Sequence, residues 1–393
     1  MDNIKHEISL LEEELISLRR DFHQYPELGY QEFRTSGIIA DYLANLGLEV
    51  TRVAGTGVVG LLRGKGGTGK TLLIRADMDA LPVEEKTDLA FKSRISGVMH
   101  ACGHDGHCAV QLIAAKVLAN HKEEIKGCVK FIFQPNEEVA GALDMIKAGV
   151  LENPKVDAAL AIHLWSPISS GKIGLSAGPV LGTTEEFELK IIGKSGHTSA
   201  PHTALDPILG AAKVIDAVQL LTSREFDPLL PIVIMFGKIQ GGKVRNSIPD
   251  CVELGGTIRF LFDEERVAKP GVLKGFERIV KGTCDSLNLG YELSFIPSNP
   301  SLVNDGDLVA LVKKAAVDTY SSGNNLEVFR SLAGEDFAEF SQRVPSVMTF
   351  VGISNAEKKT DYPHHNSSFD IDEAMMKYAV ELQVRSAFNF FKA

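Results

Sequence analysis

Apolar and polar residues follow two different periods along the first part of the chain. Short apolar runs typical of buried strands cover 48–53, 57–63, 71–76, 128–133 and 156–162. Amphipathic patterns typical of helices cover 1–20, 31–45, 109–118 and 139–148. Because strands and helices alternate, this region predicts an α/β fold with a mostly parallel sheet flanked by helices.

The pattern changes near residue 181. Strand-like runs cover 185–192, 232–239 and 252–260, and helical patterns cover 206–221 and 264–284. We interpret this block as an inserted α+β domain, with about two helices against an antiparallel sheet. From about Tyr291 the α/β pattern resumes, with helices at 307–320, 335–342 and 372–390 and a strand at 346–351. We therefore expect residues 1–180 and 292–393 to form one domain and residues 181–291 an inserted one, because 393 residues usually need more than one core.

Composition excludes some classes of protein. Hydrophobic residues make up 44% and charged residues 23%, as in ordinary soluble globular proteins. The formal net charge of −10 argues against a nucleic-acid partner, which would favour a basic face. We see no signal-peptide core and no apolar run long enough to span a bilayer, so we expect no membrane partner. The five cysteines are odd in number and widely spaced, which predicts a reducing compartment, the cytoplasm.

Acidic and imidazole side chains stand where predicted parallel strands end. Asp77 and Asp79 follow the third predicted strand, Glu137 and Glu138 follow the fourth, and His163 follows the fifth. Ligands of open α/β sheets gather at this edge, so these distant residues should converge there. Each has an ordinary alternative: a solvated acidic loop for the glutamates and a satisfied core histidine for His163.

The segment 100–107, His-Ala-Cys-Gly-His-Asp-Gly-His, gathers metal-binding side chains in what reads as one tight turn. Gly103 and Gly106 allow the backbone to bend sharply. A thiolate, imidazoles and a carboxylate are ligands that zinc and similar divalent cations prefer. The alternative is a buried structural cysteine beside scattered loop histidines.

Five side chains form a candidate ligand set: Cys102, His104, Glu138, His163 and one of His364 and His365. Five ligands suit two cations better than one, because catalytic sites keep coordination positions open for water. Adjacent carboxylates point in different directions, so one of Glu137 and Glu138 can bind metal while the other carries a proton.

Two further motifs have competing interpretations. The turn 195–202 contains His197, which a moving second domain could bring to a developing oxyanion, although an ordinary surface histidine fits equally well. Residues 64–71 match the phosphate-binding loop of NTPases. That loop must precede a helix, whereas the following run 71–76 reads as a strand, so we interpret the glycines as a turn.

Together these motifs resemble the M20 family of metallopeptidases, and most closely its amidohydrolase branch of aminoacylases, hippurate hydrolases and auxin-conjugate hydrolases. The resemblance covers nearly the whole chain and includes 20–28, 75–82, 100–107, 134–138, 162–165, 196–197, 246–250, 334–337 and 365–373. It implies a catalytic α/β domain that holds two divalent metal ions (zinc, manganese, cobalt or nickel). It also implies a smaller inserted lid domain, which often forms a homodimer.

The resemblance assigns roles to individual residues. The metal ligands it implies are Cys102, His104, Glu138, His163 and His365. Glu137 would be the general base toward a metal-activated water, and Asp79 would orient a ligand. His197 and Asn246 would stabilise the oxyanion, either within one chain or across a dimer interface. One departure from the family pattern is that Asn366 and Ser367 follow His365, without the usual proline.

The implied reaction is hydrolysis of the amide bond of a small-molecule N-acyl-amino acid, as in an aminoacylase or deacetylase. Acetylated amino acids, N-acetyldiaminopimelate and benzoyl-glycine all fit this description. The alternatives are a di- or oligopeptidase of the same family, a metal-binding relative without activity, and an NTPase that uses residues 64–71. A free base at Glu137 argues against the inactive relative, which would not need one.

Overall fold

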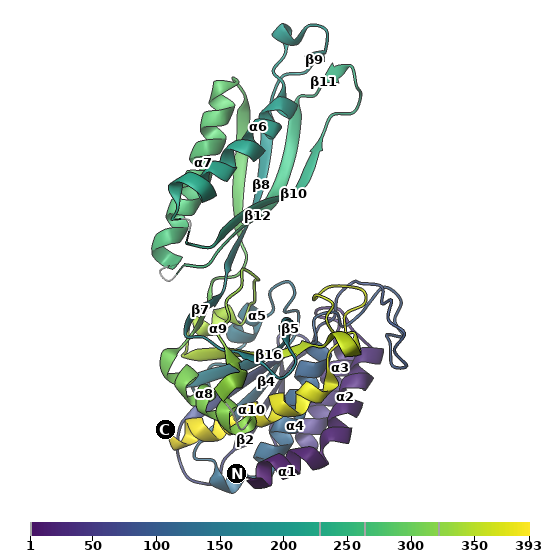
Figure 1. Cartoon of the computed structure of the whole chain (residues 1–393), viewed down its shortest axis with the longest axis vertical. Coiled ribbons are helices and arrows are strands. Elements are labelled where there is room, and N and C mark those ends of the chain that lie inside the picture. Colours follow the sequence, from purple (N-terminus) through teal and green to yellow (C-terminus); the bar gives the residue numbers. More distant parts are fainter. Residues whose placement is uncertain (1, 228, 263–264, 321–322) are drawn as a thin grey trace. The chain divides into compact units, whose positions relative to one another are not determined.

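The computed structural model describes residues 2–227, 229–262, 265–320 and 323–393. These residues fall into two compact units, which Figure 1 shows. Unit 1 comprises Met1–Gly178, Val303–Phe329 and Glu335–Ala393, and unit 2 comprises Pro179–Leu302 and Arg330–Gly334. Strands β7 (Gly178–Leu181) and β14 (Leu302–Asn304) lie where the chain passes between units.

Unit 1 is built on an eight-stranded sheet with the order β1-β2-β4-β3-β5-β16-β6-β15. Its strands are β1 (Glu49–Val53), β2 (Gly57–Arg63), β3 (Thr71–Asp77), β4 (Cys128–Gln134), β5 (Ala158–Ser169), β6 (Ile173–Gly174), β15 (Leu326–Glu327) and β16 (Ser346–Ser354). The central strands β4, β3, β5 and β16 are parallel, and β1 and β2 are antiparallel to their neighbours. Every residue of β3 is buried, as expected for a strand covered on both faces.

Helices surround this sheet (Figure 1). They are α1 (Asp2–Leu10), α2 (Glu12–Gln24), α3 (Phe33–Asn45), α4 (His104–Asn120), α5 (Ala142–Lys147), α8 (Gly306–Tyr320), α9 (Ala338–Ser341) and α10 (Met376–Lys392). Helix α4 is buried along almost its whole length, because it packs against β3 and against α2 and α10. The predicted α/β class, with a mostly parallel sheet, is therefore confirmed. Within the described residues, no helix combines the length and apolarity needed to cross a membrane.

Three predicted helices of unit 1 differ in extent from the observed ones. The N-terminal helix is interrupted at Leu11, where φ of −98° and ψ of 2° depart from helical values. The helices predicted at 139–148 and 335–342 shrink to α5 and α9. In both cases the preceding residues form separate turns that do not continue as α-helix: the Ala140 N–H donates to the Asn136 carbonyl at 3.0 Å, and the Glu339 N–H donates to the Asp336 carbonyl at 2.9 Å.

Unit 2 is an antiparallel sheet with two helices. The sheet order is β10-β12-β8-β13, and its elements are β8 (Thr183–Ile192), β10 (Ile232–Gly241), β12 (Cys251–Phe260), β13 (Gly290–Pro297), α6 (Pro207–Leu220) and α7 (Glu265–Ser286). Strand β13 corrects our interpretation of the sequence after Tyr291: it pairs with β8, with Glu292 opposite Lys190, and so belongs to this sheet. Glu264, the predicted start of the second helix, lies outside the described residues.

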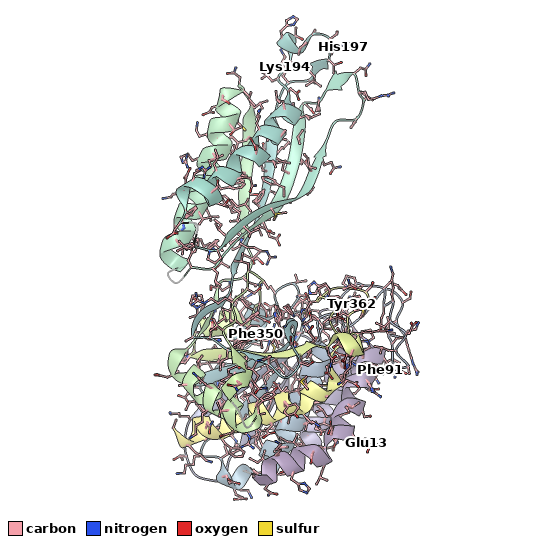
Figure 2. The ribbon with its side chains drawn as sticks, in the orientation of Figure 1. Glu13, Phe91, Lys194, His197, Phe350 and Tyr362 are labelled. Carbon is pink, nitrogen blue, oxygen red and sulfur yellow. The ribbon has the colours of Figure 1, made fainter. Side chains whose placement is uncertain are left out.

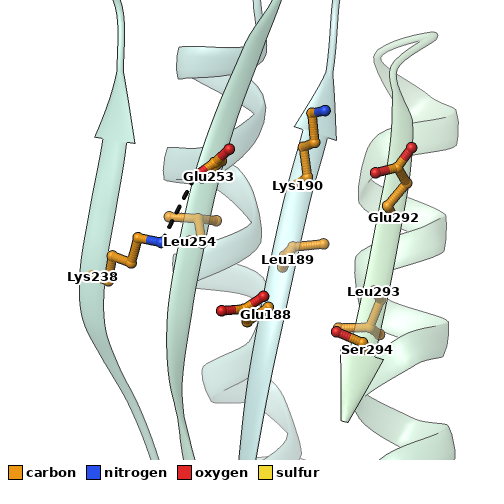
Figure 3. Close-up of a pocket in the computed structure, with 9 residues that line it drawn as sticks. All are labelled: Glu188, Leu189, Lys190, Lys238, Glu253, Leu254, Glu292, Leu293 and Ser294. Carbon is orange, nitrogen blue, oxygen red and sulfur yellow. Dashed lines mark ion pairs between the residues drawn. The ribbon is translucent and has the colours of Figure 1, made fainter. Parts of the chain in front are cut away.

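The two faces of this sheet differ in chemistry. Phe187, Leu189 and Ile191 of β8 are buried in the core of unit 2. The other face carries charged side chains around a hollow of about 390 Å³ (Figure 3), where Lys238 pairs with Glu253 at 3.7 Å. This alternation is typical of an antiparallel sheet with one solvated face, and none of the nine residues that line the hollow is a histidine or cysteine.

A buried arginine ties the N-terminal helices to the C-terminal segment of unit 1. The Arg19 side chain is 0% exposed and donates to Asp105 at 2.8 Å, to Asp370 at 2.7 Å and to Glu373 at 3.2 Å. His23 contacts the same Asp105 oxygen at 2.7 Å. Because Asp105 is also 0% exposed, its charge is compensated inside the protein rather than by water.

We predict that Arg19→Met lowers the free energy of unfolding by about 3–5 kcal/mol, because it leaves a buried carboxylate without its main counter-charge. Denaturant titration followed by circular dichroism measures the change. Arg63→Met is the control, because Arg63 is 57% exposed in its pair with Glu49 and should matter little. Equal midpoints for the two variants would contradict the account.

Candidate metal centre

The segment 100–107 brings its donors to the start of α4. Gly103 precedes the helix with φ of +90°, a conformation that favours glycine. The single turn expected from the sequence is corrected, because His104 to His107 form the first helical turn. Gly106 is needed for a different reason than bending: a Cβ atom there would lie 2.5 Å from the Leu164 side chain. Small size at 106 therefore lets α4 approach β5.

The structure brings all the predicted ligands of unit 1 together. Three overlapping groups have ligand atoms within 4.8 Å of one another: Cys102 with His104 and His163, Cys102 with Glu138 and His365, and His104 with Glu137 and Glu138. Cys102, His104 and His163 are buried, and the glutamate side chains are 10% and 14% exposed. A sulfur, three imidazoles and a carboxylate thus surround one small volume.

Hydrogen bonds to backbone carbonyls fix which ring nitrogen of each buried histidine faces the other candidate ligands. His104 Nδ1–H donates to the Asp79 carbonyl at 2.8 Å, which leaves Nε2 as the ring nitrogen without a hydrogen-bond partner. His163 Nδ1–H donates to the Leu164 carbonyl at 2.9 Å, so its Nε2 accepts from the Cys102 thiol, 3.8 Å away, and both of these atoms belong to one clustered group. Such contacts orient the ring of a metal-binding histidine and set its tautomer.

The neighbouring histidines His364 and His365 differ in the contacts that their ring nitrogens make. Both nitrogens of His364 are used, by the Ser166 hydroxyl at 3.1 Å and the Leu164 carbonyl at 3.1 Å. His365 instead points its Nε2 at Glu138, 3.3 Å away. Its backbone is in the left-handed region at φ of +65°, an unusual conformation that its N–H bond to the Ala101 carbonyl holds. Of the two, His365 has the free nitrogen.

One carboxylate holds the backbone that carries both glutamates. Asp79 accepts from the Glu137 N–H and from the Glu138 N–H, each at 3.0 Å, with one oxygen for each amide. Its own backbone carbonyl holds His104. Asp79 therefore contacts three of the surrounding residues without being one of the clustered donors itself.

The donor set fits divalent cations by a direct test. Among the described residues, His104 Nε2 and Glu138 Oε1 are buried and have no hydrogen-bond partner. Unpaired buried polar atoms are costly, and both atoms belong to the clustered groups. Thiolate, imidazole and carboxylate ligands together match zinc and related transition metals. The orphaned atoms are thus explained if cations bind between them.

Five buried side chains beside the centre were assigned no role from the sequence. Arg75 donates to Asp77 at 2.6 Å and to Glu335 and Asp336 at 3.0 Å each. His107 Nε2 accepts from the Leu164 N–H, so its Nδ1–H donates to Asp77 at 2.6 Å. A signal was present: an arginine inside the apolar run 71–76 must be paired, because such strands are buried on both faces.

Burial and neighbouring charge shift the pKa values in opposite directions. Burial, then Glu335 and Asp336, raise the pKa of Glu137 well above its usual value. Burial lowers the pKa of His104, but Asp77 and Asp79 outweigh it and raise that pKa to about 10. Burial and nearby histidines lower the pKa of His163. These opposite shifts are typical of functional sites.

The other two predicted residues lie in unit 2, His197 on a short strand and Asn246 in the turn just before its partner strand. His197 is on β9 (Gly196–His197), which pairs with β11 (Ser247–Ile248), and Thr198 donates to the Asn246 carbonyl at 3.3 Å. Figure 2 labels His197 at the tip of this unit, where it is exposed. The Ser199 N–H donates to His197 Nδ1 at 3.1 Å, so in the neutral ring Nε2 carries the proton. His197 is therefore prepared as a donor.

The NTPase alternative finds no support in the described residues. Strand β3, not a helix, follows residues 64–71. The amides of Gly64, Lys65 and Gly66 donate to carbonyls of Gly127, Lys122 and Ile125. These amides are therefore not available to cradle phosphates.

Comparisons with known proteins agree with this geometry. A profile described as Peptidase family M20/M25/M40 matches residues 73–387. The chain is 39% identical over 383 residues to Thermostable carboxypeptidase 1 of Saccharolobus solfataricus, covering 96% of this chain and 95% of the relative. It is 37% identical to N-acetyl-L-cysteine deacetylase of Bacillus subtilis, covering 93% and 85%. The solved structure of the Bacillus subtilis YXEP protein, a dinuclear metal binding peptidase from the M20 family, aligns with a TM-score of 0.84 at 31% identity, covering 98% and 99%.

We predict that cation affinity of the metal-free protein rises with pH from about 7 to about 10. A proton on His104 Nε2 competes with the cation, and the raised pKa keeps that proton in place up to about pH 10. Calorimetric titration with zinc in buffers of different ionisation enthalpy measures the released protons. An affinity that is constant over this range would contradict the assignment.

Proposed function

Because the chain belongs to Peptidase family M20/M25/M40, we propose that it hydrolyses the amide bond of N-acyl-amino acids with the help of two divalent cations in unit 1. The deacetylase relative supports the substrate class, and the dinuclear metal-binding relative supports two cations. The observation that carries the proposal is the position of Glu137 beside a set of donors whose ligand atoms lie in overlapping groups, two of those atoms being buried without a hydrogen-bond partner.

The ligands we assign are Cys102, His104, Glu138, His163 and His365. The support is that Nε2 of each of the three histidines faces another donor of the set, and that His104 Nε2 and a Glu138 oxygen have no hydrogen-bond partner. The bound cations would supply Lewis acidity toward water and toward the amide carbonyl, and zinc, manganese, cobalt and nickel all accept such ligands. Hydrogen bonds to Asp79 fix the position of the His104 ring and of the backbone of the two glutamates.

Glu137 would act as the general base. Its Oε2 lies 3.8 Å from His104 Nε2, close to the donors, while its raised pKa makes it a stronger proton acceptor than an exposed carboxylate. It would take a proton from the attacking water and give it to the nitrogen of the leaving amino acid. Glu138, held by the same aspartate, would remain a ligand, so the two adjacent carboxylates divide the work.

His197 and Asn246 would serve the oxyanion. The support is the tautomer of His197, whose Nε2–H is a hydrogen-bond donor, and the pairing of β9 with β11, which keeps Asn246 next to it. Donors aimed at the developing negative charge typically contribute a factor of about 10²–10³ in kcat.

We predict that Glu137→Gln keeps two cations per chain but lowers kcat by about 10²–10⁴-fold, because the general base is lost while its size is kept. Glu138→Gln is the matched control on the next residue, and it should lose metal instead. Metal content by atomic emission and turnover of N-acetyl amino acids measure the two effects. Near-normal kcat in Glu137→Gln would remove that residue from the role.

The same turnover assay distinguishes N-acyl-amino acids from peptides as substrates. Hydrolysis of N-acetyl or N-benzoyl amino acids without cleavage of dipeptides supports the proposal. The carboxypeptidase relative favours the alternative, a peptidase. Cleavage of dipeptides or oligopeptides without hydrolysis of N-acyl amino acids would establish that alternative.

We also propose a homodimer through unit 2 and a cytoplasmic location. Strand β10 is at the edge of its sheet and pairs, within the described residues, only with β12. It exposes Met235 by 60% and Ile239 by 64%, an apolar edge that soluble proteins usually cover. The described cysteines are free, which fits a reducing compartment.

We predict that Met235→Glu with Ile239→Glu converts the dimer to a monomer, because two charges would be buried at the paired edge. Light scattering coupled to gel filtration measures the mass. Leu10→Glu, at another exposed apolar residue in unit 1, is the control and should change nothing. A wild-type mass of a single chain at micromolar concentration would reject the dimer.

A further inference from the structure

The loop between β4 and α5, residues 135–141, carries Glu137 and Glu138, and buried carboxylates hold its backbone. The amides of residues 136, 137, 138 and 142 donate to Glu32 at 3.0 Å, to Asp79 at 3.0 Å twice, and to Asp336 at 2.8 Å. The three acceptors come from three distant parts of unit 1. The resemblance already gives Asp79 a role, whereas Glu32 and Asp336 have none.

Asp336 connects the two ends of this loop. Both of its oxygens accept from the side chain of Gln134, the last residue of β4, at 2.8 Å. One oxygen also accepts from the N–H of Ala142, the first residue of α5, at 2.8 Å, and the other accepts from Arg75 at 3.0 Å. Asp336 is 1% exposed, and all of these partners are donors. A neutral side chain with its own N–H groups could not satisfy them.

Glu32 holds the loop near its start, at Asn136. It is 0% exposed and accepts from the Asn136 N–H at 3.0 Å and from the Thr56 hydroxyl at 2.5 Å. Asn136 has φ of +55°, a conformation that a non-glycine residue adopts only when its surroundings hold it. Unlike the partners of Asp336, the Thr56 hydroxyl can also accept a hydrogen bond.

We propose that Glu32 and Asp336 are positioning residues that, with Asp79, clamp the loop 135–141 and so set where the carboxylates of Glu137 and Glu138 lie. Charge-assisted bonds to backbone amides are strong and directional, and they replace the helix or strand ladder that the loop lacks. The catalytic consequence rests on the proposed function, because misplacing a reacting group by about 1 Å can cost about 100-fold in rate. The clamp itself is a property of the fold.

The two carboxylates give opposite expectations for isosteric amide variants. In Asp336→Asn the new NH₂ faces either the Ala142 N–H or the Arg75 guanidinium, and neither can accept a hydrogen bond. In Glu32→Gln the NH₂ can donate to Thr56 while the oxygen still accepts from Asn136. Asp336→Asn should therefore release the loop, Glu32→Gln should retain it, and Glu32→Ala should release it.

The experiment is hydrogen–deuterium exchange by mass spectrometry on the full-length protein, with and without zinc, combined with kinetics of the zinc-loaded enzyme. We expect peptides covering 134–142 to exchange at least about tenfold faster in Asp336→Asn and Glu32→Ala, and within about twofold of wild type in Glu32→Gln. Turnover should fall by about 10–100-fold in the first two, with KM changed less than about threefold. If Asp336→Asn does not fold, the two Glu32 variants still decide the question.

Asp157→Asn is the matched control. Asp157 accepts from the Thr71 N–H at 2.7 Å, a bond of the same kind at the opposite end of β3, so its loss should not change exchange at 134–142. Unchanged exchange at 134–142 in both Asp336→Asn and Glu32→Ala would overturn the proposal. Acceleration spread evenly over unit 1 would also overturn it, since that marks ordinary destabilisation. If no amide substrate is turned over at all, the proposed function fails while the exchange result still tests the clamp.

Discussion

The parallel pairing of β4, β3 and β5 is the constraint on which the candidate centre depends. In the strand register, Asp77 pairs with Gln134 and Arg75 pairs with Ala161. The carboxyl ends of the three strands therefore lie at the same edge of the sheet. The aspartates, the glutamate pair and His163 converge for this reason alone, although 86 residues of sequence separate the first from the last. The donors of α4 join them because Gly106 allows a close approach to Leu164.

The convergence of these side chains at one edge of the sheet concentrates negative charge in a buried region. Neighbouring cationic side chains and hydrogen-bond donors compensate for this charge. Arg75 pairs with three carboxylates, and His107 donates to Asp77. Backbone N–H groups in and next to the loop 135–141 donate hydrogen bonds to the carboxylates of Glu32, Asp79 and Asp336. Within the clustered donors of the described chain, His104 Nε2 and an oxygen of Glu138 have no hydrogen-bond partner, and a cation fits there. The same compensation that permits burial also fixes geometry, since each carboxylate holds a piece of backbone.

Sequence reasoning reached the fold class and the position of the centre because both follow from local patterns. Alternating periods predicted the sheet, and the rule for strand ends grouped Asp79, Glu138 and His163 before any family resemblance entered. It failed where tertiary contacts decide. Turns that the periodicity does not distinguish from helix precede α5 and α9. Strand β13 resembles the return of the first pattern until its pairing with β8 is seen. The partners of Asp336 are about 200 and 260 residues away, so no local signal marks its role.

X-ray absorption spectroscopy of the zinc-loaded protein, with the metal content of the same sample, tests the central claim most directly. Two zinc ions per chain and a sulfur scatterer about 2.3 Å from zinc, lost in Cys102→Ser, are the expected results. One ion or fewer per chain, or a shell of light atoms only, would contradict a centre built from these five side chains.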